Sequence, residues 1–138
     1  MSSAATPEIV HQRARPVSRA ALGGRELGEE AVQRAVVSHL EHRGVPGVVW
    51  FHVPNGGSRS RAEAGVFRAL GTKAGVPDIL LFHRGRAYGL ELKRERGGRV
   101  SPAQSEMHAQ LRAAGVEVAV AYGLDEALEQ LKLWALLR

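Results

Sequence analysis

Cysteine is absent from all 138 residues, which excludes disulfide frameworks, cysteine-based zinc sites and thiol catalysis. No apolar run reaches the roughly 18 residues that a membrane-spanning helix needs, so no membrane partner is expected. The first residues also lack the apolar stretch of a secretory signal. Together these absences predict a cytoplasmic protein.

Two common signatures of catalysis and cofactor binding are missing as well. The sequence has neither a Walker-type glycine loop nor a G-x-S-x-G elbow, and we expect no nucleotide cofactor. His39 and His42 have a helical i, i+3 spacing that can serve zinc, but the pattern places no third ligand beside them. We therefore disfavour a zinc site and expect His39 to face the edge of the core.

Positive charge is the first feature that is present in excess. The formal net charge is +5 and the isoelectric point is about 10.4, so a polyanionic partner such as DNA is plausible. Charge alone does not decide this, because many small basic proteins bind nothing anionic. Residues 1–26 are small, polar and basic, as is typical of a flexible arm; its arginines are Arg13, Arg15, Arg19 and Arg25. Residues 27–138 have the length of one domain.

Hydrophobic periodicity predicts an α/β fold for residues 27–138. Helices are expected over 29–43, 60–70, 101–114 and 124–137, and strands over 48–53, 78–83, 86–93 and 116–122. The third helix has the clearest start, because Ser101, Pro102 and Gln104 form a capping-box sequence with proline at the first helical position. The second and third strands are close enough to form a hairpin. The strand–helix–strand unit that follows predicts a parallel crossover, and hence a mixed central sheet flanked by helices.

Charged residues stand at the ends of the two hairpin strands. Asp78 follows Pro77 at the start of one strand, and Glu91 and Lys93 lie on one face at the end of the next. Two carboxylates and an ammonium at one sheet edge can bind a hard divalent cation and activate water beside it. The simpler alternative is an ion pair between Glu91 and Lys93, with Asp78 capping a turn. The acid placed one strand upstream favours the cation site.

The Pro77-Asp78 and Glu91-Leu92-Lys93 motifs resemble the PD-(D/E)xK nuclease superfamily. An ordered set of motifs over about residues 29–134 resembles, more specifically, the virus-type replication-repair nuclease (VRR-NUC) family. The supporting motifs are Glu29-x-x-x-Gln33, His52-Val53-Pro54-Asn55-Gly56, Gly71-x-Lys73-x-Gly75-Val76-Pro77-Asp78 and Ser101-Pro102-x-Gln104. The resemblance implies a restriction-endonuclease-like core with the order α-β-α-β-β-α-β-α. It also implies a metal-dependent DNA phosphodiesterase of a bacterial or virus-infected host cell.

The resemblance assigns roles to the residues of the two central motifs. Asp78 and Glu91 are expected to bind Mg²⁺ or Mn²⁺ together with the backbone carbonyl of Leu92. Lys93 matches the catalytic lysine, which would hold or deprotonate the attacking water and offset phosphate charge. This set defines the expected catalytic centre of the domain.

The resemblance also places an acid of the first helix and a glutamine near the metal. Glu29 is preferred to Glu30 as a ligand, directly or through water, because helix phase puts it on the side of Gln33 and the apolar stripe. Gln104 matches the glutamine of the serine-proline-x-glutamine motif. A capping box wants glutamine at that position for structural reasons, so both roles stay open.

DNA contacts are expected on segments that flank the charged cluster. Phosphate binding by such residues would be independent of base sequence and sensitive to salt. Each residue also has a simpler explanation, because Asn-Gly is a turn signal and single surface cations are commonly only solvated. The candidate DNA-binding residues are Asn55, Arg59, Arg61, Lys73, Arg94, Arg96 and Arg99.

The leading hypothesis is a small endonuclease that hydrolyses DNA phosphodiester bonds by metal-activated water. The resemblance implies action on branched or Holliday-junction DNA, as in DNA repair, by a homodimer. The final helix is the candidate dimer element, with core packing as an equal alternative; its apolar residues are Leu131, Leu133, Trp134, Leu136 and Leu137. Competing hypotheses are a non-catalytic DNA-binding or phage accessory protein that retains the fold, and a nuclease subunit or toxin whose basic arm binds a protein partner.

Overall fold

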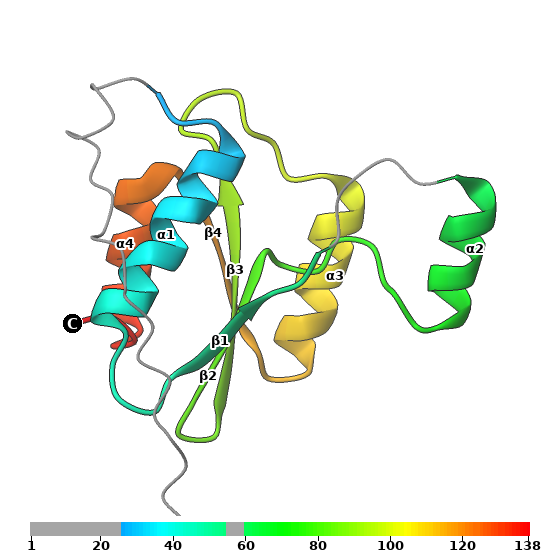
Figure 1. Ribbon diagram of the computed structural model, residues 1–138. Helices are drawn as coiled ribbons and strands as arrows, with labels where there is room; N and C mark the ends of the chain where they lie inside the picture. Colours follow the sequence, from blue (N-terminus) through cyan, green and yellow to red (C-terminus); the bar gives the residue numbers. More distant parts are fainter. Residues whose placement is uncertain (1–25, 55–59) are drawn as a thin grey trace, which may run out of the picture.

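Four strands form one mixed sheet in the order β1-β2-β3-β4 in the computed structural model (Figure 1). The structure describes residues 26–54 and 60–138. The elements along the chain are α1 (Glu29–Arg43), β1 (Val49–His52), α2 (Arg61–Ala69), β2 (Ile79–His83), β3 (Arg86–Lys93), α3 (Pro102–Ala113), β4 (Glu117–Tyr122) and α4 (Gly123–Leu133). The predicted α/β fold and element order are confirmed. The predicted arm up to residue 25, and the predicted DNA contacts of Asn55 and Arg59, lie outside the described residues.

The hairpin of β2 and β3 is closed by the two-residue turn Arg84-Gly85. Both turn residues have positive φ angles, 48° and 77°, which match the turn to the right-handed twist of the strands. β1 pairs antiparallel with β2, and β4 pairs parallel with β3 after the α3 crossover. The parallel pairing continues as far as Lys93 and Tyr122. The polar end of β3 therefore lies between neighbouring elements rather than at a free edge.

The hydrophobic core lies between one face of the sheet and the helices α1 and α4. α3 lies on the opposite face, where it contacts β4 (Figure 1). Alternate residues of the strands enter this core, because successive side chains of a strand point to opposite faces. Fully buried core residues include Val32, Val36, Ile79, Leu81, Leu90, Leu92 and Leu131. Each such side chain contributes about 1.5–3 kcal/mol of burial free energy. The same alternation turns Glu91 and Lys93 to the opposite face of β3.

The last helix is shorter than predicted, because α4 ends at Leu133 instead of continuing to Leu137. Ala135 has a φ angle of 59°, and the N–H groups of Ala135 and Leu136 donate to the carbonyls of Lys132 and Leu131. This is a Schellman end, which usually carries glycine at the left-handed position. Alanine takes that position here, so the sequence lacks the usual stop signal.

The segment after α4 completes the core. Leu136 and Leu137 are buried, the N–H of Val45 donates to the Leu136 carbonyl, and Leu137 forms a β-bridge with Gly44. Core packing thus accounts for most of the apolar residues at the end of the chain, whereas Leu133 is 80% exposed. No helix of the described ranges is both long and apolar enough to cross a membrane.

Candidate functional site

Asp78 is fixed at the start of β2 by contacts to both neighbouring strands. Its Oδ2 accepts a hydrogen bond of 2.7 Å from the backbone N–H of Leu92 in β3. Its carbonyl accepts from the Val53 backbone N–H at 3.3 Å and lies 2.6 Å from His52 Nδ1. The preceding residue is buried against Gly89, where an added Cβ would lie 2.9 Å from the Pro77 ring. The Asp78 carboxylate is therefore held against the end of β3.

Glu91 and Lys93 share one face of β3, as predicted, and both are almost completely buried, with 1% and 6% of their surface exposed. The Lys93 Nζ lies 3.6 Å from Glu91 Oε1. The loop after β3 passes directly over the lysine, because a Cβ at Gly98 would lie 2.9 Å from the Lys93 Cβ. Buried charges at this density are costly unless they are paired or bind a ligand.

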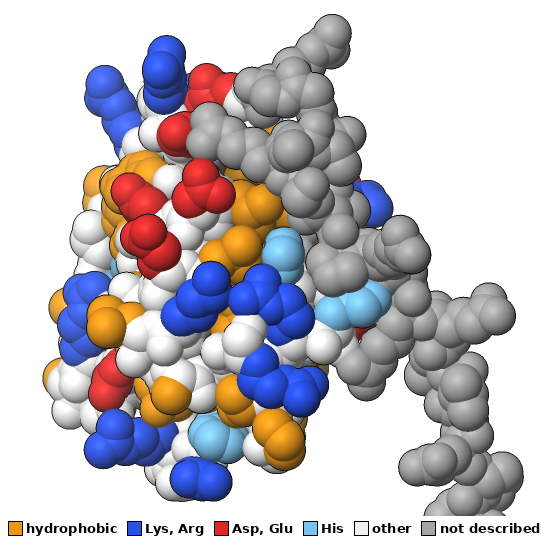
Figure 2. All heavy atoms as spheres, turned by 90° about the vertical axis from the view of Figure 1, so that its left-hand side faces the viewer, with side chains coloured by type: hydrophobic (Ala, Val, Ile, Leu, Met, Phe, Trp, Pro, Cys, Tyr) orange, Lys and Arg blue, Asp and Glu red, His pale blue; other side chains and the backbone are white. Residues whose placement is uncertain are grey.

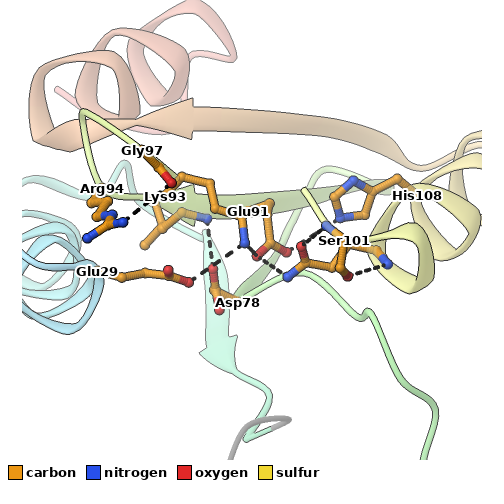
Figure 3. A network of polar contacts seen from close by, with 10 residues as sticks. Glu29, Asp78, Glu91, Lys93, Arg94, Gly97, Ser101 and His108 are labelled. Atoms are coloured by element: carbon orange, nitrogen blue, oxygen red, sulfur yellow. Dashed lines mark hydrogen bonds and ion pairs between the residues drawn. The ribbon is translucent and has the colours of Figure 1, made fainter. Parts of the chain in front are cut away.

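Glu29, in the first turn of α1, completes an acidic triad with Asp78 and Glu91. Each of the three offers a carboxylate oxygen, and these oxygens lie within 4.8 Å of one another. Glu29 Oε1 is also 3.9 Å from Lys93 Nζ (Figure 3). The neighbouring Glu30 instead forms an exposed ion pair of 2.8 Å with Arg34. The structure thus brings Glu29 into the cluster and leaves Glu30 out of it.

The electrostatics of the triad favour an added positive charge. Burial, followed by the nearby Asp78 carboxylate, raises the pKa of Glu91 from 4.5 to about 8, although the Lys93 ammonium acts in the opposite direction. A bound cation would favour the ionised form of Glu91, and one ammonium does not balance three ionised carboxylates. Oxygen donors are the ligands that Mg²⁺ and Mn²⁺ prefer, so the donor set fits a hard divalent cation. Leu92 contacts Asp78 through its N–H, and the ligand role of its carbonyl stays a prediction.

Gln104 combines the two roles that the sequence leaves open. Its Oε1 accepts from the Ser101 N–H at 2.9 Å while Ser101 Oγ accepts from the Gln104 N–H at 3.1 Å, which completes a capping box. The other end of the same side chain donates from Nε2 to Glu91 Oε1 at 3.0 Å. The start of α3 is thereby tied to the acidic triad.

An open depression of about 580 Å³ leads to the triad. It lies between the start of α1, the end of β1, the loop before β2 and the start of α3; its polar lining includes Glu29, Gln33, His52, Asp78, Ser101 and Gln104. The loop is locked onto α3 at Gly75, whose φ angle is 81° and where an added Cβ would overlap the carbonyl of Ala103. The depression gives the triad access to solvent and to a ligand.

The sequence interpretation missed His108, which is 2% exposed and lies against the triad. Its Nε2 is 3.4 Å from Glu91 Oε2. Burial, then Arg112 and Lys93, lowers the pKa of the imidazole from 6.5. The sequence does place His108 four residues after Gln104, and residues four apart lie on the same side of a helix. This spacing could have identified His108 as a neighbour of the site.

His39 and His42, the pair with the zinc-like spacing, lie outside the triad. His39 is buried, with its Nδ1 3.2 Å from the Arg43 guanidinium, and His42 Nδ1 is 2.7 Å from the Ser38 carbonyl. In residues 26–54 and 60–138, the acidic triad is the one cluster of three potential metal ligands.

The candidate DNA-binding residues within the described ranges are all exposed and lie on three segments of the chain. Arg61 begins α2, Lys73 lies in the loop before β2, and the other three lie in the loop after β3; these are Arg94, Arg96 and Arg99. The Arg94 guanidinium lies 3.5 Å from the Gly97 carbonyl (Figure 3). On the α1 and α4 side of the molecule, acidic side chains gather mainly in the upper part of the view and basic side chains in its middle and lower parts (Figure 2).

Comparisons with known proteins agree with the geometry. The family model described as "VRR-NUC domain" matches residues 27–125. A solved structure named "VRR_NUC domain protein" is similar with 26% identity and a TM-score of 0.65, over 78% of this chain and 88% of that one. A second, named "VRR_NUC domain", has 21% identity and a TM-score of 0.53, over 75% and 94%, and supports the fold. A comparison with curated proteins gives no match. The chain belongs to the VRR-NUC family, which is a family of nucleases.

Proposed function

We propose that this chain is a metal-dependent DNA endonuclease that hydrolyses phosphodiester bonds of branched or junction DNA as a homodimer. The observation that carries the proposal is the acidic triad with a buried lysine beside it, at the bottom of an open depression. Family membership supports the nuclease activity. The metal dependence, the substrate and the assembly are our inference from the site and the surface.

Asp78 and Glu91 would hold Mg²⁺ or Mn²⁺, with Glu29 and the Leu92 carbonyl as further ligands. When bound, such an ion lowers the pKa of water and stabilises charge on a phosphate. The Lys93 ammonium donates hydrogen bonds and accepts none, so it is suited to orient a water or a phosphate oxygen beside the triad. Gln104 holds Glu91 from the other side through the hydrogen bond at Oε1.

Branched DNA would lie across the mouth of the depression. The two loops that contribute to its lining carry exposed cations at Lys73 and Arg94, and Arg61 stands at the start of α2. Cations of this kind bind phosphates without regard to sequence, so cleavage is expected to weaken as salt rises.

Two uncovered apolar surfaces support the homodimer. The first is on α2, where Val66 and Leu70 are exposed. None of its residues is buried, and it packs against no other helix or strand of the described chain. The second lies on β1 and β2, where the exposed Phe51 and Phe82 rings stack with centroids 5.8 Å apart. Exposed apolar surfaces of this kind mark interaction sites, and a second copy would cover both. These surfaces replace the final helix as our candidate dimer contact.

Cleavage of a panel of labelled DNAs tests the activity. The panel holds a Holliday junction, a flap, a nicked duplex and a single strand, each digested with Mg²⁺, Mn²⁺ or EDTA. We expect cutting that needs the metal, favours the junction or flap, and falls about 10²- to 10³-fold in Lys93→Ala, as on removal of one charge-stabilising donor.

Lys132→Ala is the matched control, because Lys132 is an exposed lysine on α4. It should cut like the wild type. A wild-type protein that binds these DNAs but cuts none of them above the Lys93→Ala level would instead be a non-catalytic DNA-binding member of the family.

A further inference from the structure

α3 presents two polar side chains to the two oxygens of Glu91. Gln104 Nε2 donates to Oε1, which also faces the Lys93 ammonium on the side of the triad. Oε2 faces His108, one helical turn further along α3, across the 3.4 Å to its Nε2 (Figure 3). Glu91 is thus enclosed from the α3 side at both oxygens.

The His108 contact is unusual because it leaves two buried polar atoms without hydrogen bonds. Among the described residues, neither Glu91 Oε2 nor His108 Nε2 has a hydrogen-bond partner. An unpaired buried polar atom costs about 1–3 kcal/mol. An apolar ring would fill the same space without that cost, so packing alone does not account for a histidine here.

The two atoms are separated by slightly more than a hydrogen bond. N–H···O bonds have donor–acceptor distances of about 2.7–3.2 Å. A side-chain shift of a few tenths of an ångström would therefore convert the present contact into a bond from His108 Nε2–H to Glu91 Oε2. Outer partners of this kind fix the orientation of carboxylates that bind metals.

We propose that His108 is a positioning residue for the metal ligand Glu91, to which its Nε2–H donates at Oε2 when the cation is bound. This inference rests on the proposed function. Gln104 and His108 together fix the plane of the carboxylate from α3, and Oε1 stays available to the triad. His108 touches neither the DNA nor the reacting atoms, and it acts through Glu91 alone.

Mn²⁺ binding measured by calorimetry, without DNA, tests the proposal. His108→Phe keeps a ring but removes the nitrogen, and we expect it to weaken Mn²⁺ binding about 10- to 100-fold. His108→Gln retains an N–H donor and should restore most of that loss. His42→Ala, on α1 and outside the triad, should bind like the wild type. Melting curves in EDTA report whether each variant is folded.

Equal Mn²⁺ affinity of His108→Phe and the wild type would overturn the proposal, as would equal losses in the Phe and Gln variants. A wild-type protein that binds no Mn²⁺ would instead overturn the proposed function, and the inference with it. If His108→Phe does not fold, the wild-type imidazole ¹⁵N spectrum with Mg²⁺ decides. A proton on Nε2 supports the proposal, and a proton on Nδ1 alone overturns it.

Discussion

α2 and α3 both begin with a serine cap, yet they are attached to the molecule in opposite ways. In each helix the serine Oγ accepts from the N–H three residues on, at 3.1 Å, at Ser60 and at Ser101. α3 continues into the triad through Gln104 and His108 and is locked to the loop at Gly75. α2 has an apolar face but buries none of its residues. The difference separates a helix that is tied to the acidic triad from a helix whose side chains all remain at least partly exposed.

The largest effect is expected from a substitution that breaks the contact of α3 with the triad but keeps the helix cap. Gln104→Glu retains a capping-box residue but replaces the donor to Glu91 with a like charge. We expect DNA cleavage to fall by about 10²-fold or more, as on loss of a ligand's outer partner. Cleavage assays and thermal melting are measured together. Unchanged cleavage would show that the Gln104–Glu91 bond has no role in the activity.

Removing the apolar face of α2 should change assembly and leave the metal site intact. We expect the wild type to sediment as a dimer at micromolar concentration and the double variant Val66→Ser, Leu70→Ser to sediment as a monomer. Both positions are exposed in the single chain, so its stability should change little. Mn²⁺ affinity should match the wild type. A monomeric wild type would refute the dimer.

The buried Glu91 should make the stability of the metal-free protein depend on pH. The pKa in the folded chain, about 8, is above the ordinary 4.5, so unfolding between these pH values releases a proton. The free energy of unfolding should therefore fall as pH rises through this window. Denaturant melts in EDTA should show a flatter pH dependence for Glu91→Gln. Glu63→Gln, on α2, is the control and should keep the wild-type slope.

The smallest effects are expected from removing the serine caps, which compares the two helices directly. Ser101→Ala should lower the free energy of unfolding by about 1 kcal/mol, because α3 is part of the cooperative fold. Ser60→Ala should fray α2, seen as faster amide exchange there, and leave the global unfolding midpoint unchanged. Equal losses of global stability in the two variants would show that α2 is also held by the core.

Local signals predicted most of the elements. α1 begins at Glu29 and ends at Arg43 as its apolar period and the following Gly44 indicate. The start of α3 follows from Ser101 and Pro102, since a capping box requires contacts only within one turn. The end of α4 was not predictable, because alanine takes the left-handed position usually held by glycine.

The site required information that single segments do not carry. The motifs indicated Asp78, Glu91 and Lys93, but the bond from the Leu92 N–H to Asp78 depends on the register of the hairpin. His108 carried no motif, and its importance follows only from the burial of Glu91 beneath α3. The sequence also did not predict that α2 buries none of its residues. An apolar helical period indicates a face that can be buried, but it does not show whether another part of the chain packs against that face.

The docking of α1 has a consequence for when the acidic triad forms during synthesis. Glu29 is among the first described residues to be made, but α1 packs against β3 and against α4, the last element of the fold. A growing chain therefore has Glu29, Asp78 and Glu91 before it has α4, against which α1 packs. A ribosome-bound or truncated chain without α4 is expected to carry no assembled triad. Under the proposed function, DNA near a translating ribosome meets no cleaving site on a chain that has not yet made α4.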